Sequence, residues 1–212
     1  YCFNADIANV TFTGTTGGNY SIVGNPLNIS VDANGTVTWN NQITPGSYTV
    51  YYEIGAGACS SNDSFTFTID NPITASFTSS STSFCEGNST TVTMSGTPNA
   101  TVTYNDGTSN QTIVLDNAGN ASFNHVGGTK TYTLVNVILG TCTQSLNGSV
   151  TVTVNPIPQF TIPANLTFCE SSSNTISVTA INFNLNTATY VWTFNNNPLP
   201  DTTSSITVNQ SG

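Results

Sequence analysis

The chain has 212 residues, of which 37% are hydrophobic and 10% aromatic, enough for several small cores, so we do not expect disorder. Only 5% of the residues are charged: Lys130 is the only lysine or arginine, ten residues are acidic, and the formal net charge is -9. A protein that neutralises phosphates needs several basic side chains, so this composition excludes nucleic-acid binding and argues against docking on anionic lipids. All apolar runs are shorter than the roughly 18 residues of a membrane span, so we expect no membrane insertion.

The first predicted unit covers residues 1–71. It opens at Tyr1-Cys2-Phe3, without the charged and apolar segments of a signal peptide. Turns are predicted at 32–35 (Asp-Ala-Asn-Gly) and 44–46 (Thr-Pro-Gly), because Gly supplies the positive φ that tight turns need. Apolar and polar residues alternate over 64–69, which predicts a strand with one buried face. Pro72 then lacks an N–H group, which favours an extended connection to the next unit.

The second predicted unit, residues 72–156, repeats the first. Its Phe-Cys-Glu motif at 84–86 is the counterpart of Tyr1-Cys2-Phe3, and its closing Thr-Val-Thr-Val-Asn-Pro at 151–156 matches 66–72. The residues before Phe84 have no counterpart before Tyr1, so we expect the first unit to lack its opening strand. Alternation predicts a strand at 149–154, and turn signals fall at 105–107, 116–119 and 127–128.

The third predicted unit, residues 157–212, follows a second proline joint at 155–158. The Phe-Cys-Glu motif returns at 168–170, and alternation over 189–194 predicts another strand. We expect this unit to be truncated at its C-terminal side, because the sequence ends before the second cysteine of the repeat.

The five cysteines give the period of the repeat. Equivalent cysteines are 83 or 84 residues apart (85 − 2, 142 − 59 and 169 − 85), and the two cysteines of one unit are 57 apart (59 − 2 and 142 − 85). About seven short alternating strands in about 84 residues, with turn signals between them and no stretch of helical spacing, are typical of an Ig-like sandwich. The predicted fold class is therefore all-β, with tandem Ig-like antiparallel β-sandwich domains arranged end to end.

We predict one disulfide within each unit, Cys2 with Cys59 and Cys85 with Cys142. Cys169 stays unpaired, because its partner would lie beyond Gly212. On the chain-entropy model, each bond contributes on the order of 4 kcal/mol. Free buried thiols and a metal site are the alternatives, although zinc sites need cysteines much closer in sequence. Paired cysteines would imply an oxidising, extracellular location.

Few residues suggest chemistry. His125 is the only histidine, and we interpret it as a surface residue. No pair of carboxylates marks a cleft, so we predict no enzyme and no cofactor. Asp32 and Asp116 occupy equivalent turns and are candidate calcium ligands, but each turn offers one carboxylate where calcium takes six or more oxygens, so we interpret both as plain hairpin turns and keep calcium as the alternative. Trp39 and Trp192 are interpreted as core residues rather than as sugar-stacking platforms.

The Phe-Cys-Glu opening, the Thr-Val-Thr-Val-Asn-Pro closing and the Ser-, Thr- and Asn-rich residues between them resemble the tandem Ig-like or PKD-like repeats of very large bacterial adhesins. These are adhesins of the gliding-motility type, which the type IX secretion system exports. Residues 189–195 and 205–208 also resemble the middle of such a repeat. The resemblance covers essentially the whole chain and rests on composition and rhythm. Asp201-Thr202-Thr203 fits the short motif that such bacteria use for O-glycans, so Thr202 is a candidate glycosylation site.

The resemblance implies a filament of sandwiches on the outer surface of the cell, attached to the outer membrane, in which these repeats are spacers for surface attachment and gliding. The expected partners are neighbouring repeats of the same polypeptide, with surface polysaccharide and the secretion or motility machinery as further candidates. The alternative function is a carbohydrate-binding or accessory β-sandwich module of a secreted multidomain enzyme. That alternative would need an exposed aromatic platform.

Overall fold

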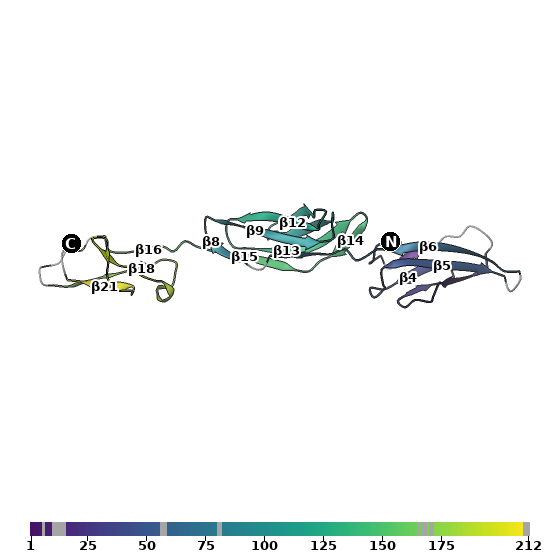
Figure 1. Ribbon diagram of the computed structural model, residues 1–212, viewed down its shortest axis with the longest axis horizontal. Coiled ribbons are helices and arrows are strands. Elements are labelled where there is room, and N and C mark those ends of the chain that lie inside the picture. The colour runs from purple at the N-terminus through teal and green to yellow at the C-terminus, as the bar shows by residue number, and fades with distance from the viewer. Residues whose placement is uncertain are drawn as a thin grey trace. The chain divides into compact units, whose positions relative to one another are not determined.

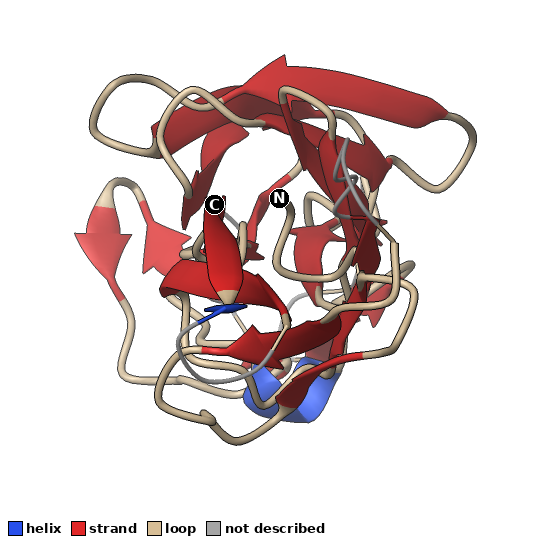
Figure 2. Cartoon of the chain, turned by 90° about the vertical axis from the view of Figure 1, so that its right-hand side faces the viewer, coloured by secondary structure: helices blue, strands red, loops and turns tan. Residues whose placement is uncertain are grey.

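The computed structural model describes residues 1–5, 7–9, 16–55, 59–79, 82–164, 166, 169 and 172–209. The chain divides into two compact units, one of Tyr1–Thr82 with Ser89–Thr153 and one of Ser83–Asn88 with Val154–Gly212. Strands and loops dominate both, as Figures 1 and 2 show. Among the described residues, no helix has the length and apolar character needed to cross a bilayer. Phe168 and Glu170 of the third Phe-Cys-Glu motif lie outside the described residues.

The first sandwich packs two three-stranded sheets against each other, β1-β4-β3 and β2-β5-β6. In an Ig fold these are the B-E-D and C-F-G sheets. The hairpin of β5 and β6 stays in register from Gly46 opposite Ile69 to Ile54 opposite Ser61. The strands are β1 (Ile7–Asn9), β2 (Asn19–Ile22), β3 (Ile29–Val31), β4 (Thr36–Trp39), β5 (Gly46–Ile54) and β6 (Ser61–Ile69).

The core of the first sandwich draws on both of its sheets. Val37 and Trp39 of β4 pack with Val50 of β5 and with Phe67 and Ile69 of β6. The predicted alternation over 64–69 is confirmed for its second half, because Phe67 and Ile69 are buried while Thr66 and Thr68 face solvent. Phe65, which the pattern would bury, is 40% exposed. Trp39 is 5% exposed, so its interpretation as a core residue is confirmed.

The second sandwich has the sheets β12-β9-β7 and β11-β10-β13-β15-β8, with β14 paired to β13. This order matches E-B-A and C′-C-F-G-A′ of an Ig domain. Buried Val92, Met94, Val102, Val137 and Val152 fill the space between the sheets. The strands are β7 (Ala75–Phe77), β8 (Thr82–Cys85), β9 (Ser89–Gly96), β10 (Thr101–Asn105), β11 (Asn110–Val114), β12 (Asn120–Val126), β13 (Lys130–Leu139), β14 (Cys142–Ser145) and β15 (Ser149–Asn155).

His125 is a correction to the sequence analysis, since its side chain is 2% exposed rather than on the surface. It lies on the buried face of β12, where its Nδ1 is 2.7 Å from the hydroxyl of Tyr132 on β13. A buried polar group needs a hydrogen-bond partner, and the Tyr132 hydroxyl is the partner of the His125 Nδ1. The carbon atoms of the imidazole ring are apolar and can be buried without a partner. His125 is therefore a core residue that links the two sheets of the second sandwich.

The third group of strands forms three two-stranded sheets, β16-β18, β17-β21 and β19-β20. The prediction of a strand over 189–194 is mostly wrong, because only Thr193–Phe194 pair, with Asn197–Pro198. Alternating apolar and polar residues favour a strand, but the strand forms only where a neighbouring strand pairs with its backbone N–H and C=O groups. The elements are β16 (Phe160–Thr161), β17 (Asn174–Ser177), β18 (Thr179–Ala180), the 3-10 turn η2 (Leu185–Thr187), β19 (Thr193–Phe194), β20 (Asn197–Pro198) and β21 (Ser205–Val208).

The strand order thus makes the chain an all-β protein with tandem Ig-like sandwiches, as predicted. Every sheet takes its strands from one of the predicted repeats 1–71, 72–156 and 157–212. The exact boundaries remain our proposal.

Candidate functional site

The N-terminal segment is fixed along the end of β6. The Tyr1 amino group donates to the Thr68 carbonyl oxygen over 2.6 Å and lies 3.9 Å from the Asp70 carboxylate. The backbone N–H of Asp70 donates in return to the Tyr1 carbonyl oxygen over 2.9 Å. The Tyr1 ring makes edge contacts with Trp39 and Phe67. These contacts order the segment at the point where the first sandwich ends and the connection to the second begins.

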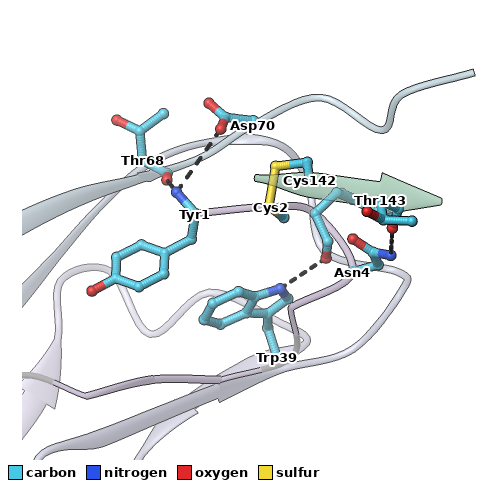
Figure 3. The surroundings of a disulfide bond; sticks show 9 residues. Tyr1, Cys2, Asn4, Trp39, Thr68, Asp70, Cys142 and Thr143 are labelled. Carbon is cyan, nitrogen blue, oxygen red and sulfur yellow. Dashed lines mark hydrogen bonds and ion pairs between the residues drawn. A yellow bond between two sulfur atoms is a disulfide. The ribbon is translucent and has the colours of Figure 1, made fainter. Parts of the chain in front are cut away.

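Cys2 is held from its other side as well. Trp39 Nε1 donates to the Phe3 carbonyl oxygen over 3.0 Å, so the buried indole satisfies its one donor at the backbone next to Cys2 (Figure 3). With Tyr1 bound to β6 and Phe3 bound to β4, the Cys2 backbone has little freedom.

Cys142 lies where β13 turns back into β14. Leu139 of β13 pairs with Cys142 across the hairpin, and Gly140 takes the positive φ of 58° that the tight turn requires. The next residue, Thr143, accepts a 2.6 Å hydrogen bond at its carbonyl oxygen from the Asn4 side chain. The hairpin of the second sandwich therefore contacts the N-terminal segment of the first.

A disulfide joins Cys2 to Cys142, with their Cα atoms 5.4 Å apart (Figure 3). It connects the first sandwich to the second. We call the disulfide, the Asn4–Thr143 hydrogen bond and the connecting residues Asn71–Ile73 the joint. The bonded cysteines are 140 residues apart, so on the chain-entropy model the bond contributes about 5 kcal/mol.

The predicted pairing of Cys2 with Cys59 is wrong for a geometric reason. Cys2 lies beside Asp70, just past the last residue of β6, whereas Cys59 lies just before Ser61, the first residue of β6. A strand of nine residues is about 27 Å long, and disulfide-bonded Cα atoms are at most about 7 Å apart. The two cysteines of one repeat are therefore at opposite ends of its sheet.

The predicted pairing of Cys85 with Cys142 is wrong for the same reason. Glu86, next to Cys85, donates its N–H to the carbonyl oxygen of Asn155, the last residue of β15. Cys142 instead pairs with Leu139, at the opposite end of β13 from the residues that pair with β15. Cys59, Cys85 and Cys169 are all exposed free thiols in the structure.

The Asp32 and Asp116 carboxylates close equivalent turns. Asp32 Oδ1 accepts hydrogen bonds from the backbone N–H groups of Asn34 and Thr36, and Asp116 Oδ1 accepts from those of Ala118 and Asn120. The Thr36 N–H, together with that of Asn34, lowers the pKa of Asp32. Among the described residues no three His, Cys, Asp or Glu side chains gather into a metal-binding group. Each of these two carboxylates thus accepts hydrogen bonds from the backbone of its own turn.

The Asp106 carboxylate is stabilised in its charged form by hydrogen bonds and by one ion pair. Its carboxylate accepts from the Thr108 hydroxyl and from the backbone N–H groups of Thr108 and Ser109, and it lies 3.5 Å from Lys130 Nζ. The Thr108 hydroxyl is the main cause of a pKa well below the usual range of an aspartate. The carboxylate stabilises the turn between β10 and β11.

The other candidate residues lie in the third predicted repeat, residues 157–212. Thr202 is exposed on the loop before β21. Trp192 is half-buried, and its Nε1 donates to the Thr203 carbonyl oxygen over 2.9 Å. Its side chain lines a groove of about 800 Å³ with other apolar residues, including Phe160, Phe183 and Tyr190.

No protein-family model matches the sequence, and no curated protein matches it. Among solved structures, titin domains I67–I69 share 14% identity over 94% of this chain and 80% of theirs, with a TM-score of 0.48. Domains 3–5 of Drosophila OTK share 16% identity over 72% of this chain and 57% of theirs, with a TM-score of 0.33. A Ca2+-stabilized adhesin of an ice-binding Antarctic bacterium shares 15% over 80% of this chain and 50% of its own, with a TM-score of 0.33.

The chain therefore spans just over half of the OTK fragment and half of the adhesin chain. These likenesses are weak, and the Ig-like assignment follows from the strand order of the chain itself.

Proposed function

We propose that the chain is a non-catalytic structural and adhesive repeat segment of a very large secreted surface adhesin, in which it acts as a spacer. The observation that carries the proposal is the Cys2–Cys142 disulfide, which links one Ig-like sandwich to the next rather than stapling either one internally. A bond of this kind joins consecutive domains of a filament covalently, in addition to the backbone that connects them.

The disulfide changes how the chain bears tension. A force applied along the chain reaches Cys2, crosses to the sulfur of Cys142 and continues from there. The 140-residue stretch closed by the bond carries no load, so unfolding of the first sandwich would add no length to a tethered chain. A spacer that connects a cell to a surface under shear benefits from that limit on extension.

The surface chemistry supports an extracellular spacer. Disulfides persist in oxidising compartments outside the cytoplasm. Threonine hydroxyls pair across exposed strand faces in place of charges, as between Thr49 and Thr66 and between Thr131 and Thr151. With Lys130 as the only lysine or arginine, trypsin-like proteases have one site to cut.

The finer assignment, a gliding-motility adhesin exported by the type IX system and held at the outer membrane, rests on the sequence resemblance. The Phe-Cys-Glu opening of the second and third repeats and the Asn-Pro motif that closes the first and second repeats support it. In the structure, the opening motif places Cys2 and Cys85 beside the closing residues Asp70 and Asn155, so the two motifs meet at the end of each sandwich.

The proposal is tested on cells of the source organism with an antiserum raised against the 212-residue chain. We expect the serum to label intact cells, and an in-frame deletion of the segment to weaken attachment under flow and to slow gliding. A strain carrying Gly128→Ala, where an added Cβ would meet nothing within 4 Å, is the matched control and should attach normally. Labelling that requires permeabilised cells, or a deletion without effect on attachment, would contradict the proposal.

The alternative, a carbohydrate-binding module, is favoured by one observation, the groove beside Trp192. Trp39 cannot serve as a platform, because it is buried. Tryptophan fluorescence of the chain and of Trp192→Ala, titrated with soluble oligosaccharides, distinguishes the two functions. Saturable quenching that is lost in Trp192→Ala would support the carbohydrate-binding module. No quenching in the parent chain would support the spacer function.

A further inference from the structure

Three exposed thiols, Cys59, Cys85 and Cys169, have no disulfide partner in the structure. The repeat assigns each of them a structural position. Cys2, Cys85 and Cys169 occupy the opening motif, and we call them the opening cysteines. Cys59 and Cys142 lie 57 residues after an opening cysteine, and we call them the hairpin cysteines.

The opening cysteines of the first two repeats both lie beside the residues that close their own repeat. The Asp70 N–H donates to the Tyr1 carbonyl oxygen beside Cys2, and the Glu86 N–H beside Cys85 donates to the Asn155 carbonyl oxygen. Asp70 and Asn155 are equivalent residues that precede the proline joints. An opening cysteine therefore lies at the end of a sandwich where the chain leaves for the next repeat.

The hairpin cysteines lie at the other end. Cys142 is at the turn between β13 and β14, and Cys59 is between β5 and β6, the equivalent strands of the first sandwich. In the one disulfide that forms, an opening cysteine bonds to the hairpin cysteine of the following repeat. An opening cysteine and the hairpin cysteine of its own repeat cannot meet, because the length of a strand separates them.

We infer that this bond is a rule of the array: every opening cysteine pairs with the hairpin cysteine of the next repeat. Cys85 and Cys169 would each bond to a hairpin cysteine one repeat further along a longer polypeptide, and Cys59 would bond to the opening cysteine of a repeat before it. The inference deepens the proposed function and rests on it, since it names adjacent repeats as the partners of the exposed thiols.

Each bond requires an oxidant. The two thiols lose two protons and two electrons as the S–S bond forms, and a small-molecule disulfide such as oxidised glutathione takes these up and leaves as two thiols. The exposure of Cys59, Cys85 and Cys169 lets the oxidant reach them.

The bonds would also overlap along the chain. Each closes a stretch of about 140 residues, while opening cysteines recur every 83 or 84, so consecutive closed stretches overlap and every residue of the array lies inside at least one of them. Tension would then pass mainly through disulfides and the short segments that join them.

The test adds one repeat made from the chain's own residues. A second copy of Ile73–Pro156, 84 residues long, is inserted after Pro156 in the full chain, which recreates the Asn-Pro-Ile joint of residues 71–73. The purified variant is oxidised with a glutathione buffer and alkylated, and its intact mass and linked peptides are measured. The parent chain, treated in the same way, should show one disulfide and three alkylated thiols.

The inserted variant has seven cysteines, and the inference predicts two disulfides and again three thiols. Cys85 of the first copy should be linked to Cys142 of the second copy, while Cys2 stays linked to the first Cys142. Cys85→Ser in the first copy should remove only the new bond, and Cys59→Ser should keep both bonds and leave two thiols.

One disulfide with five thiols, or a bond between Cys85 and Cys142 of the same copy, would overturn the inference. Such a result would leave the spacer proposal standing, because that proposal fails on cell labelling and attachment. A parent chain without the Cys2–Cys142 bond would remove the basis of both.

Discussion

At the scale of single residues, three aspartate carboxylates stabilise the turns in which they lie. Asp32, Asp106 and Asp116 each accept at least two backbone N–H groups of their own turn. Turn residues between strands leave N–H groups without ladder partners, and a short side chain with two acceptor oxygens satisfies them locally. The sequence predicted these turns, since Asp and Gly together are a local signal.

Asp106→Asn should change the pH dependence of stability. The lowered pKa means that the folded state prefers the charged carboxylate, so this stabilisation is present above the ordinary aspartate pKa of about 3.9 and is lost as the pH falls toward the folded value. We expect the variant to have a lower Tm than the parent at pH 6 and the gap to narrow between pH 4 and pH 2. Thermal unfolding followed by circular dichroism measures both, and Asp201→Asn, an exposed aspartate in the other unit, should show no such narrowing.

Gly119 is a position where only glycine fits. Its φ is 79°, and a Cβ there would collide with the carbonyl oxygen of Gly96. The two backbones are held together because the Gly96 N–H donates to the Gly119 carbonyl oxygen over 2.8 Å. Gly119→Ala should therefore lower the free energy of unfolding by about 2 kcal/mol or more. Urea denaturation gives the value. Gly128→Ala is the control, because its Cβ would meet nothing within 4 Å, and an equal loss there would contradict the explanation.

At the scale of strands, alternation alone predicted β6 and β15 well and failed over residues 189–194. β6 and β15 have long neighbours, β5 and β13, that satisfy their backbone groups. Residues 189–192 have no ladder partner among the described residues, although their pattern is the same. The burial pattern is local information, whereas strand formation depends on what lies beside the segment.

The threonine pairs should contribute measurably to strand pairing. Thr131 and Thr151 are directly opposite each other, with their hydroxyl oxygens 2.9 Å apart. A double-mutant cycle with Thr131→Val and Thr151→Val, which keeps the branched shape, should give a coupling energy of about 0.5 kcal/mol. Chemical denaturation of the four proteins measures it. The same cycle between Thr131 and Thr112, which lies on β11 beyond β10, should give a value near zero, and equal couplings would refute a direct contact.

At the scale of the whole chain, the repeat period was visible in the sequence and the disulfide connectivity was not. Equal spacing identified Cys2 with Cys85 and Cys59 with Cys142 as equivalent positions. Equivalence says nothing about contact, and the pairing within one repeat was the wrong one, because the two cysteines of a repeat lie at opposite ends of its strands. The strand directions would have shown this, since β6 begins at Ser61, two residues after Cys59, and ends at Ile69, just before the residue that bonds beside Cys2.

The closed stretch between Cys2 and Cys142 should be visible in single-molecule pulling. With handles before Tyr1 and after Gly212, the parent chain can extend only through the residues outside the disulfide, whereas Cys2→Ser frees the whole chain. Because the bonded residues are 140 apart, the variant should gain about 490 Å of contour length at about 3.5 Å per residue.

Cys59→Ser, which removes an exposed free thiol, should extend no further than the parent. Reduction with dithiothreitol should give the parent the contour length of Cys2→Ser, because it cleaves the same bond. If parent and Cys2→Ser reach equal lengths under oxidising conditions, the joint carries no tension, and the stability of the sandwiches limits how far the chain extends. If the difference is as expected, the length to which the chain extends depends on the redox state of the joint rather than on the stability of its domains.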